Sequence, residues 1–259
     1  MTTTNSNFLK LCALVITLGG CGNSGVERIV LPKNLKEISG LAVEGNTLLA
    51  VADEKSRIYR INFEEGLVKY LGALGDPPLK GDFEGIATDG PDIYLITSDG
   101  ILYRRSVSAE DGAFDKFETG IGDLCEIEGL EIKAGLAYIL CKTARDESVE
   151  KQLTVFAWDI AQAAVVEGGG LRVPWSQLPD GDKLHPSALA FIDGEWLVLA
   201  ARQKRWLVLD EQGSFLRGGK LPNRGTHPQA EGVAVLGDAT YIADEGKKRG
   251  SLTRYPGRF

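Results

Sequence analysis

Short apolar runs that alternate with polar residues recur along the chain from Val26 to Phe259, separated by turns rich in Gly, Asn and Asp. A period of two is typical of strands with one buried face, and no stretch of this region has the period of a helix. The first group predicts strands at Gly40–Val43, Leu48–Ala52, Arg57–Phe63 and Leu67–Leu71. The pattern therefore predicts an all-β fold.

A short phrase begins each group of strands and occurs five times. The copies are Ser39-Gly40-Leu41-Ala42, Glu84-Gly85-Ile86-Ala87, Glu128-Gly129-Leu130, Ser187-Ala188-Leu189-Ala190 and Glu231-Gly232-Val233-Ala234. Their second residues lie 45, 44, 59 and 44 positions apart. A period of this length, with four short strands in each repeat, is that of a β-propeller blade.

The later repeats predict the same strands as the first. Second strands are expected at Ile93–Thr97, Leu136–Leu140, Trp196–Ala200 and Thr240–Ala243. Third strands are expected at Ile101–Arg105, Leu153–Trp158, Trp206–Leu209 and Ser251–Tyr255.

The fifth repeat has room for only three strands, which would leave an exposed sheet edge in its blade. Val26–Leu31 is a spare apolar strand ahead of the first repeat. We expect it to complete the last blade and close a single propeller over 26–259. Five blades follow, with six as the alternative if the 59-residue interval contains a degenerate blade.

Residues 1–20 have the layout of a secretory signal, in which Lys10 precedes an apolar run too short to span a membrane. The following Leu18-Gly19-Gly20-Cys21 is similar to a bacterial lipobox, which predicts lipidation of Cys21 and membrane attachment through a spacer over 21–25. Gly22 after the cysteine favours the outer membrane, facing the periplasm, if the cell is Gram-negative. A plain cleaved signal with an incidental cysteine is the alternative.

Charge and cysteine content refine this prediction. Removing the signal, whose one charged residue is Lys10, changes the formal charge from −7 to −8, so nucleic acid is not an expected partner. Cys125 and Cys141 are then the remaining thiols besides Cys21, and export to an oxidising compartment favours a disulfide between them over two buried free thiols. A predicted turn near Gly135 makes them approximate cross-strand neighbours.

Polar residues at the starts of the first strands should converge on the propeller axis, since in a propeller these strands line the central channel. Around the ring they read Ser39, Glu84, Glu128, Ser187 and Glu231. The ends of the second strands share this face and carry Asp53, Glu54, Asp99, Lys142, Arg202, Asp244 and Glu245.

Converging carboxylates repel one another, so either their pKa values rise or a cation joins them. We therefore expect a metal site at Glu84, Glu128 and Glu231, and oxygen ligands favour Ca²⁺ over Zn²⁺ or Mg²⁺. The alternative is that the ring residues only hydrogen-bond backbone N–H groups. Candidate ligand-binding residues are Ser39, Ser187, Asp53, Asp99, Lys142, Arg202 and Asp244.

Two basic residues interrupt the acidic rim. Lys142 and Arg202 could hold the anionic part of a ligand, such as a phosphate or carboxylate, or they could neutralise neighbouring carboxylates. The extra residues of the 59-residue interval fall in Thr143–Gln152 and Pro174–His185, on the same face, where they form either a lid with Trp175 or solvated loops.

Across the whole mature chain the sequence resembles the SdiA-regulated family of exported β-propeller proteins. The resemblance rests on the Ser-Glu-Glu-Ser-Glu order and on Gln229-Ala230-Glu231-Gly232-Val233-Ala234 followed by Tyr241-Ile242-Ala243-Asp244-Glu245. It implies export and a propeller fold but no particular activity. Lys142 and Arg202 depart from the acidic ends of the other second strands.

These observations favour a non-catalytic envelope protein that binds Ca²⁺ and a small ligand or a protein partner. The alternative is a Ca²⁺-dependent hydrolase of phosphate esters or lactones, in which Glu84, Glu128, Glu231 or His185 serves as base. Whether the protein is an enzyme stays open at this stage.

Overall fold

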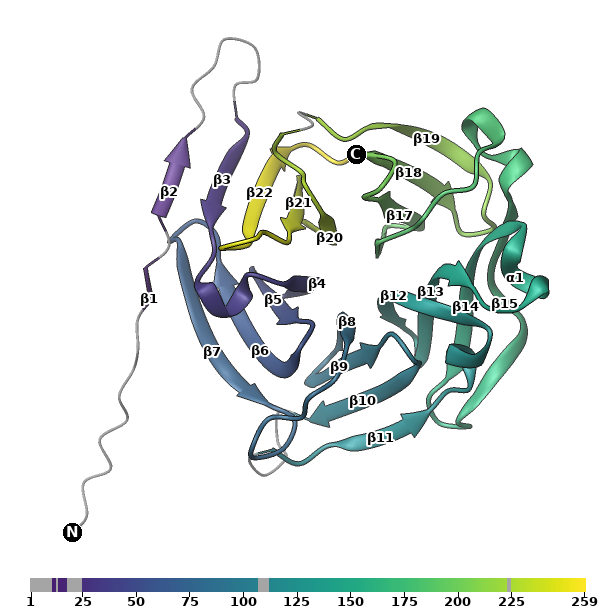
Figure 1. The fold of residues 1–259 in the computed structure, drawn as a ribbon, viewed down its shortest axis with the longest axis horizontal. Coiled ribbons are helices and arrows are strands. Elements are labelled where there is room, and N and C mark those ends of the chain that lie inside the picture. The colour runs from purple at the N-terminus through teal and green to yellow at the C-terminus, as the bar shows by residue number, and fades with distance from the viewer. Residues whose placement is uncertain (1–10, 13, 18–24, 107–111, 223–224) are drawn as a thin grey trace.

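The protein is a five-bladed β-propeller, as predicted (Figure 1). The computed structural model describes residues 11–12, 14–17, 25–106, 112–222 and 225–259. The predicted lipidation residue, Cys21, lies outside them. No described helix is both long and apolar enough to cross a membrane.

Each of the first four blades is one antiparallel sheet whose strands follow chain order from the axis outward. Blade one contains β4 (Ile38–Glu44), β5 (Thr47–Ala52), β6 (Lys55–Asn62) and β7 (Leu67–Ala73). Blade two contains β8 (Phe83–Asp89), β9 (Asp92–Thr97), β10 (Ile101–Ser106) and β11 (Asp115–Glu118). Blade three contains β12 (Cys125–Lys133), β13 (Leu136–Ala144), β14 (Gln152–Asp159) and β15 (Ala164–Pro174). Blade four contains β16 (Ala188–Ile192), β17 (Glu195–Ala200), β18 (Arg205–Asp210) and β19 (Phe215–Lys220).

The N-terminal strand closes the ring. Blade five contains β20 (Ala230–Leu236), β21 (Ala239–Asp244) and β22 (Ser251–Pro256), and β3 (Glu27–Val30) pairs antiparallel with β22 as its outer strand. Two further strands, β1 (Leu11–Cys12) and β2 (Leu14–Thr17), pair with β7 and β3. The predicted closing strand is therefore confirmed.

The 59-residue interval contains no sixth blade. Its extra residues lengthen β13 and β15 and form the helix α1 (Glu147–Glu150) and the 3-10 turns η3 (Trp175–Gln177) and η4 (Pro179–Gly181). The two inserted loops contact each other, since Nε1 of Trp175 donates to the carbonyl oxygen of Glu150 at 3.0 Å. The 3-10 turns η1 (Lys33–Leu35) and η2 (Ile121–Asp123) precede β4 and β12.

Apolar side chains pack between blades. Five buried clusters occur, one at each junction of neighbouring blades, and the closing strand contributes Ile29 to the cluster between blades five and one. Cys125 and Cys141 lie in the cluster between blades two and three, where a disulfide joins them with 5.7 Å between their Cα atoms.

The innermost strands approach one another so closely that the repeat glycines have no room for a side chain. A Cβ atom on Gly85 would lie 2.9 Å from the backbone nitrogen of Leu130 in the next blade. Equivalent approaches occur at Gly40, which faces Ile86, and at Gly232, which faces Leu41. This close approach explains the glycine in four of the five copies of the repeated phrase, whereas blade four has Ala188 at this position.

We expect Gly85→Ala to lower the free energy of unfolding by about 1 to 3 kcal/mol, because the added methyl group overpacks the contact with Leu130. Denaturant unfolding measures the change. Gly225→Ala is the control, since a Cβ atom there has no neighbour within 4 Å. Equal stability of the two variants would contradict this account of the glycine.

Candidate functional site

The polar residue at the start of four repeats is the extra residue of a β-bulge. In β4 the register shifts between Ile38 and Gly40, so Ser39 has no partner on β5. The same irregularity isolates Glu84 in β8, Glu128 in β12 and Glu231 in β20. Because a bulge bends its strand and re-aims the extra side chain, these residues depart from the in-and-out alternation of their strands.

The two serines of the ring join neighbouring blades. Ser39 Oγ donates to the carbonyl oxygen of Phe83 at 2.6 Å, and Ser187 Oγ donates to that of Ala230 at 2.7 Å. Ser187 Oγ also accepts from the backbone N–H of Ala201 at 3.0 Å. Both hydroxyl groups are buried and serve the structure in this way.

The three glutamates form a carboxylate cluster of Glu84, Glu128 and Glu231. Burial and the negative charges of Glu128 and Asp82 raise the pKa of Glu84 to about 10. Burial raises the pKa of Glu128 to about 8, although the nearby Lys142 opposes the rise. Burial also raises the pKa of Glu231, one of whose oxygens, Oε2, is buried without a hydrogen-bond partner.

Lys142 supplies a cation to this cluster from within the chain. Its ammonium group contacts Glu128 and lies 3.6 Å from Glu126. Burial acts to lower the pKa of Lys142, but Glu128 and the other carboxylates raise it above its usual value. The lysine therefore stays charged and neutralises part of the cluster.

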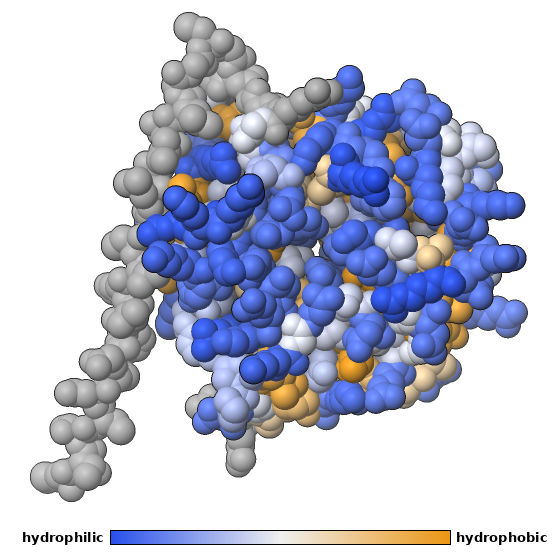
Figure 2. All heavy atoms as spheres, viewed as in Figure 1, coloured by the Kyte–Doolittle hydropathy of each residue, from blue (hydrophilic) through white to orange (hydrophobic). Residues whose placement is uncertain are grey.

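A cavity of about 450 Å³ adjoins the cluster, and we call it the ring-face pocket. The side chains that matter for its chemistry are Lys142, His185, Ser187, Arg202, Lys204 and Glu231. Thr143, near the end of β13, also lines it, and His185 comes from the inserted loop that follows η4. Mainly hydrophilic residues cover the face of the propeller seen in Figure 2.

Four of the predicted ligand-binding residues do not line this pocket: Ser39, whose contacts are given above, and Asp53, Asp99 and Asp244. Asp53 lines a separate cavity of about 220 Å³ beside Glu37, and burial and Glu37 raise its pKa to about 6. Asp99 is exposed and accepts a hydrogen bond from Thr97 Oγ1. Asp244 is 1% exposed and pairs with His227, whose Nδ1 lies 2.7 Å from Asp244 Oδ2.

The buried pair of His227 and Asp244 continues to a third residue, because Nε2 of His227 lies 2.7 Å from Tyr255 Oη. This chain of contacts packs the loop before β20 onto blade five. Sequence reasoning missed it, as it missed Lys204 and Gln229 in the pocket. The one feature of the sequence that could have pointed to Lys204 and Gln229 as pocket residues is their position next to predicted strand ends on the ring face.

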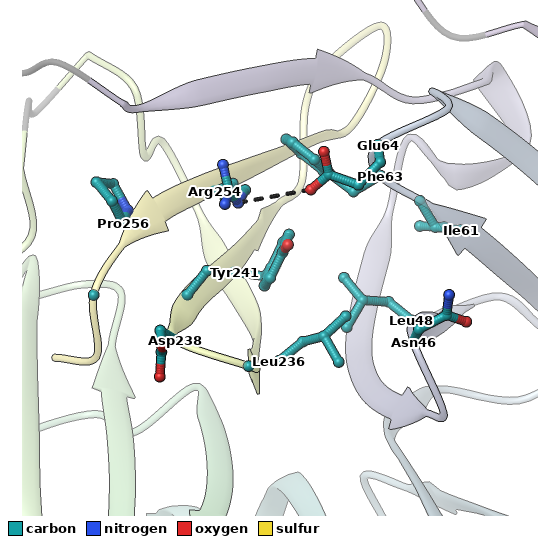
Figure 3. Close-up of a pocket in the computed structure, with 13 residues that line it drawn as sticks. Asn46, Leu48, Ile61, Phe63, Glu64, Leu236, Asp238, Tyr241, Arg254 and Pro256 are labelled. Carbon is teal, nitrogen blue, oxygen red and sulfur yellow. Dashed lines mark ion pairs between the residues drawn. The ribbon is translucent and has the colours of Figure 1, made fainter.

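A second cavity, of about 540 Å³, lies at the junction of blades five and one (Figure 3). It is lined by the turns at Asn46 and Asp238, which are at the opposite face from the ring. Phe63 and Tyr241 pack edge to face on its apolar side, and Arg254 is 3.9 Å from Glu64 across it. The convergent carboxylates lie at the ring-face pocket, so we assign the candidate site there despite the smaller volume.

A metal-binding group is not preformed among the described residues: no three His, Cys, Asp or Glu side chains lie close enough together to hold an ion. The unpartnered oxygen of Glu231 is nevertheless a free ligand atom at the cluster. A Ca²⁺ ion there would need carbonyl, hydroxyl or water oxygens to complete its coordination.

Comparison with known proteins identifies the fold. No family model matches the chain, and no curated protein matches it. Glutaminyl cyclase from Myxococcus xanthus aligns with a TM-score of 0.61 at 15% identity, over 96% of this chain and 98% of that one. A PQQ-bound aldose sugar dehydrogenase from Streptomyces coelicolor gives a TM-score of 0.54 at 15% identity, over 88% and 98%. A luciferin-regenerating enzyme gives 0.51 at 12%, over 95% of each chain. At these identities the likeness shows the propeller fold alone.

We expect Glu84→Gln to stabilise the protein at about pH 8 and to have little effect at about pH 4. The pKa of Glu84 rises from 4.5 to about 10 on folding, so above pH 4.5 the unfolded chain ionises first and stability falls as pH rises. Glutamine does not ionise, so the variant does not lose this stability as pH rises. We expect the difference in free energy of unfolding to exceed about 1 kcal/mol at pH 8.

Denaturant unfolding at the two pH values measures the difference. Glu65→Gln, at an exposed position, is the control and should change stability equally at both. A Glu84→Gln variant that is less stable than the wild type at pH 8 would show that the carboxylate, not its burial, favours the fold.

Proposed function

We propose that the protein is a non-catalytic binding protein of the cell envelope that holds a divalent cation, Ca²⁺, and a small ligand at the ring face. The observation that carries the proposal is the carboxylate cluster, where Glu84 and Glu231 are half-buried and, among the described residues, form no ion pair with Lys or Arg. The Oε2 atom of Glu231 is buried without a hydrogen-bond partner. Lys142 pairs with Glu128 and leaves the other two carboxylates for an added cation. Ca²⁺ accepts flexible sets of oxygen ligands, which suits this arrangement.

Membership of the SdiA-regulated family, lipidation of Cys21 and location in the outer membrane are part of the same proposal. Their support is the sequence resemblance and the signal-like N-terminus. The fold opposes one route to hydrolysis, because the Ser187 hydroxyl donates to Ala230 and accepts from Ala201 and is therefore not free to act as a nucleophile.

We expect Ca²⁺ at millimolar concentration to raise the melting temperature, since a ligand that binds only the folded state stabilises it. The effect should grow between about pH 6 and pH 8, because Ca²⁺ must displace protons from Glu84 and Glu231, whose pKa values are raised. Glu231→Gln should abolish the shift, and the exposed Glu65→Gln should keep it. Lys142→Met should enlarge it by removing the competing ammonium group.

A flat melting temperature over this range would overturn the calcium proposal. Hydrolysis of phosphodiester or lactone substrates that needs Ca²⁺ and is lost in Glu128→Gln would instead favour the hydrolase.

The position of Gly25, at the start of the propeller domain, supports an orientation at the membrane. Gly25 packs against Pro256, because a Cβ atom on Gly25 would lie 3.1 Å from the Pro256 ring, and Pro256 lines the cavity on the face opposite the ring. A lipid on Cys21 would be four residues away from Gly25. The ring face would then point away from the bilayer.

In proteoliposomes that display the protein outward, we expect proteases to cleave the inserted loop Thr143–Gln152 as readily as in detergent solution. Protection of this loop by the bilayer would contradict the orientation.

A further inference from the structure

The two basic residues of the rim, Lys142 and Arg202, have different environments. The sequence left open whether they neutralise neighbouring carboxylates or hold the anionic group of a ligand, and the structure favours a different role for each. Lys142 contacts Glu128 and so neutralises a carboxylate. Arg202 lines the same ring-face pocket, and within the described ranges no Asp or Glu is at ion-pair distance from its guanidinium group. A cation without an acidic partner is notable in a chain whose formal charge is −7.

A neutral acceptor orients Arg202. Its Nη1 lies 3.3 Å from Nε2 of His185. Burial and the charge of Arg202 lower the pKa of His185, so at about pH 7 the imidazole is uncharged and its Nε2 accepts the hydrogen bond. The guanidinium keeps its full charge and most of its N–H donors for a ligand.

Lys204 has the same kind of partner. Its Nζ donates to the carbonyl oxygen of Pro228 at 2.5 Å, and it lines the pocket with Arg202 and the amide of Gln229. Two cationic groups held by uncharged acceptors therefore face one cavity. Glu231 lines the same pocket and repels a second negative charge, which favours a ligand with one oxyanion group over a polyanion.

We propose that this wall of the ring-face pocket is an oxyanion subsite, in which Arg202 and Lys204 bind the carboxylate or phosphate group of the small ligand and His185 is a positioning residue. The oxyanion subsite rests on the proposed function in that the ring face binds a small ligand. The subsite needs no metal, so the subsite and the Ca²⁺ site can fail independently of each other.

The test is calorimetric titration of the purified protein with inorganic phosphate and, separately, with acetate, with and without Ca²⁺. We expect at least one probe to bind in the millimolar range, and the tighter one identifies the oxyanion that the ligand carries. Arg202→Gln should weaken binding by about tenfold or more, because charge-assisted bidentate hydrogen bonds are lost. The control Arg249→Gln removes an exposed arginine that does not line the pocket and should leave the affinity unchanged.

Further variants separate the oxyanion subsite from misfolding and from the cation site. Arg202→Lys keeps the charge without the planar fork and should give intermediate affinity. His185→Gln retains an acceptor and should bind nearly as the wild type does, whereas His185→Leu should bind more weakly. Arg202→Gln should keep the wild-type response to Ca²⁺, and a melting temperature close to that of the wild type without Ca²⁺ shows that it is folded.

Absence of heat with both probes, or equal affinity of the wild type and Arg202→Gln, would overturn the subsite whatever the response to Ca²⁺. Oxyanion binding in a protein that ignores Ca²⁺ would support the subsite and overturn only the cation proposal.

Discussion

The close approach of the five inner strands around one axis is the constraint on which the site depends. Each first strand must pass the next within contact distance of its backbone, so the repeated phrase has Gly40, Gly85, Gly129 and Gly232 where a side chain would collide or crowd. The residue before each of these glycines cannot continue the regular pairing and becomes the extra residue of a bulge. Ring closure thus determines both the glycine and the aim of the polar residue beside it.

The contacts of that polar residue in each blade determine whether its side chain is free to bind a ligand or a cation. Ser39 and Ser187 give their hydroxyl protons to the next blade and are occupied by the fold. A glutamate at the same position has more oxygen atoms than local donors, and burial then makes its charge costly. Lys142 offsets part of that cost at Glu128, so the unneutralised acid is concentrated at Glu84 and Glu231.

The repeat made most of the fold predictable from sequence. Strand positions, the number of blades and the closing role of Val26–Leu31 follow from a period of apolar runs and from the need to avoid a free sheet edge. Side-chain partners at the second-strand ends do not follow from such patterns. Asp244 lies one residue after a predicted strand just as Asp53 does. The buried His227, from the loop before β20, pairs with Asp244, whereas no histidine in the described part of the chain pairs with Asp53.

A symmetric frame therefore produces an asymmetric site through departures from the repeat. The ring-face pocket lies over blades three, four and five, where basic residues replace the acidic second-strand ends at Lys142 and Arg202. The lengthened strand β13 and the inserted loop after η4, both in the longest interval, contribute Thr143 and His185 to the pocket. The other three intervals between repeats are 44 or 45 residues long and form their blades without these extra residues. The extra residues, and the basic side chains of Lys142 and Arg202, are therefore not needed to close the propeller. Because they coincide at one cavity, we place the candidate site in this sector of the ring.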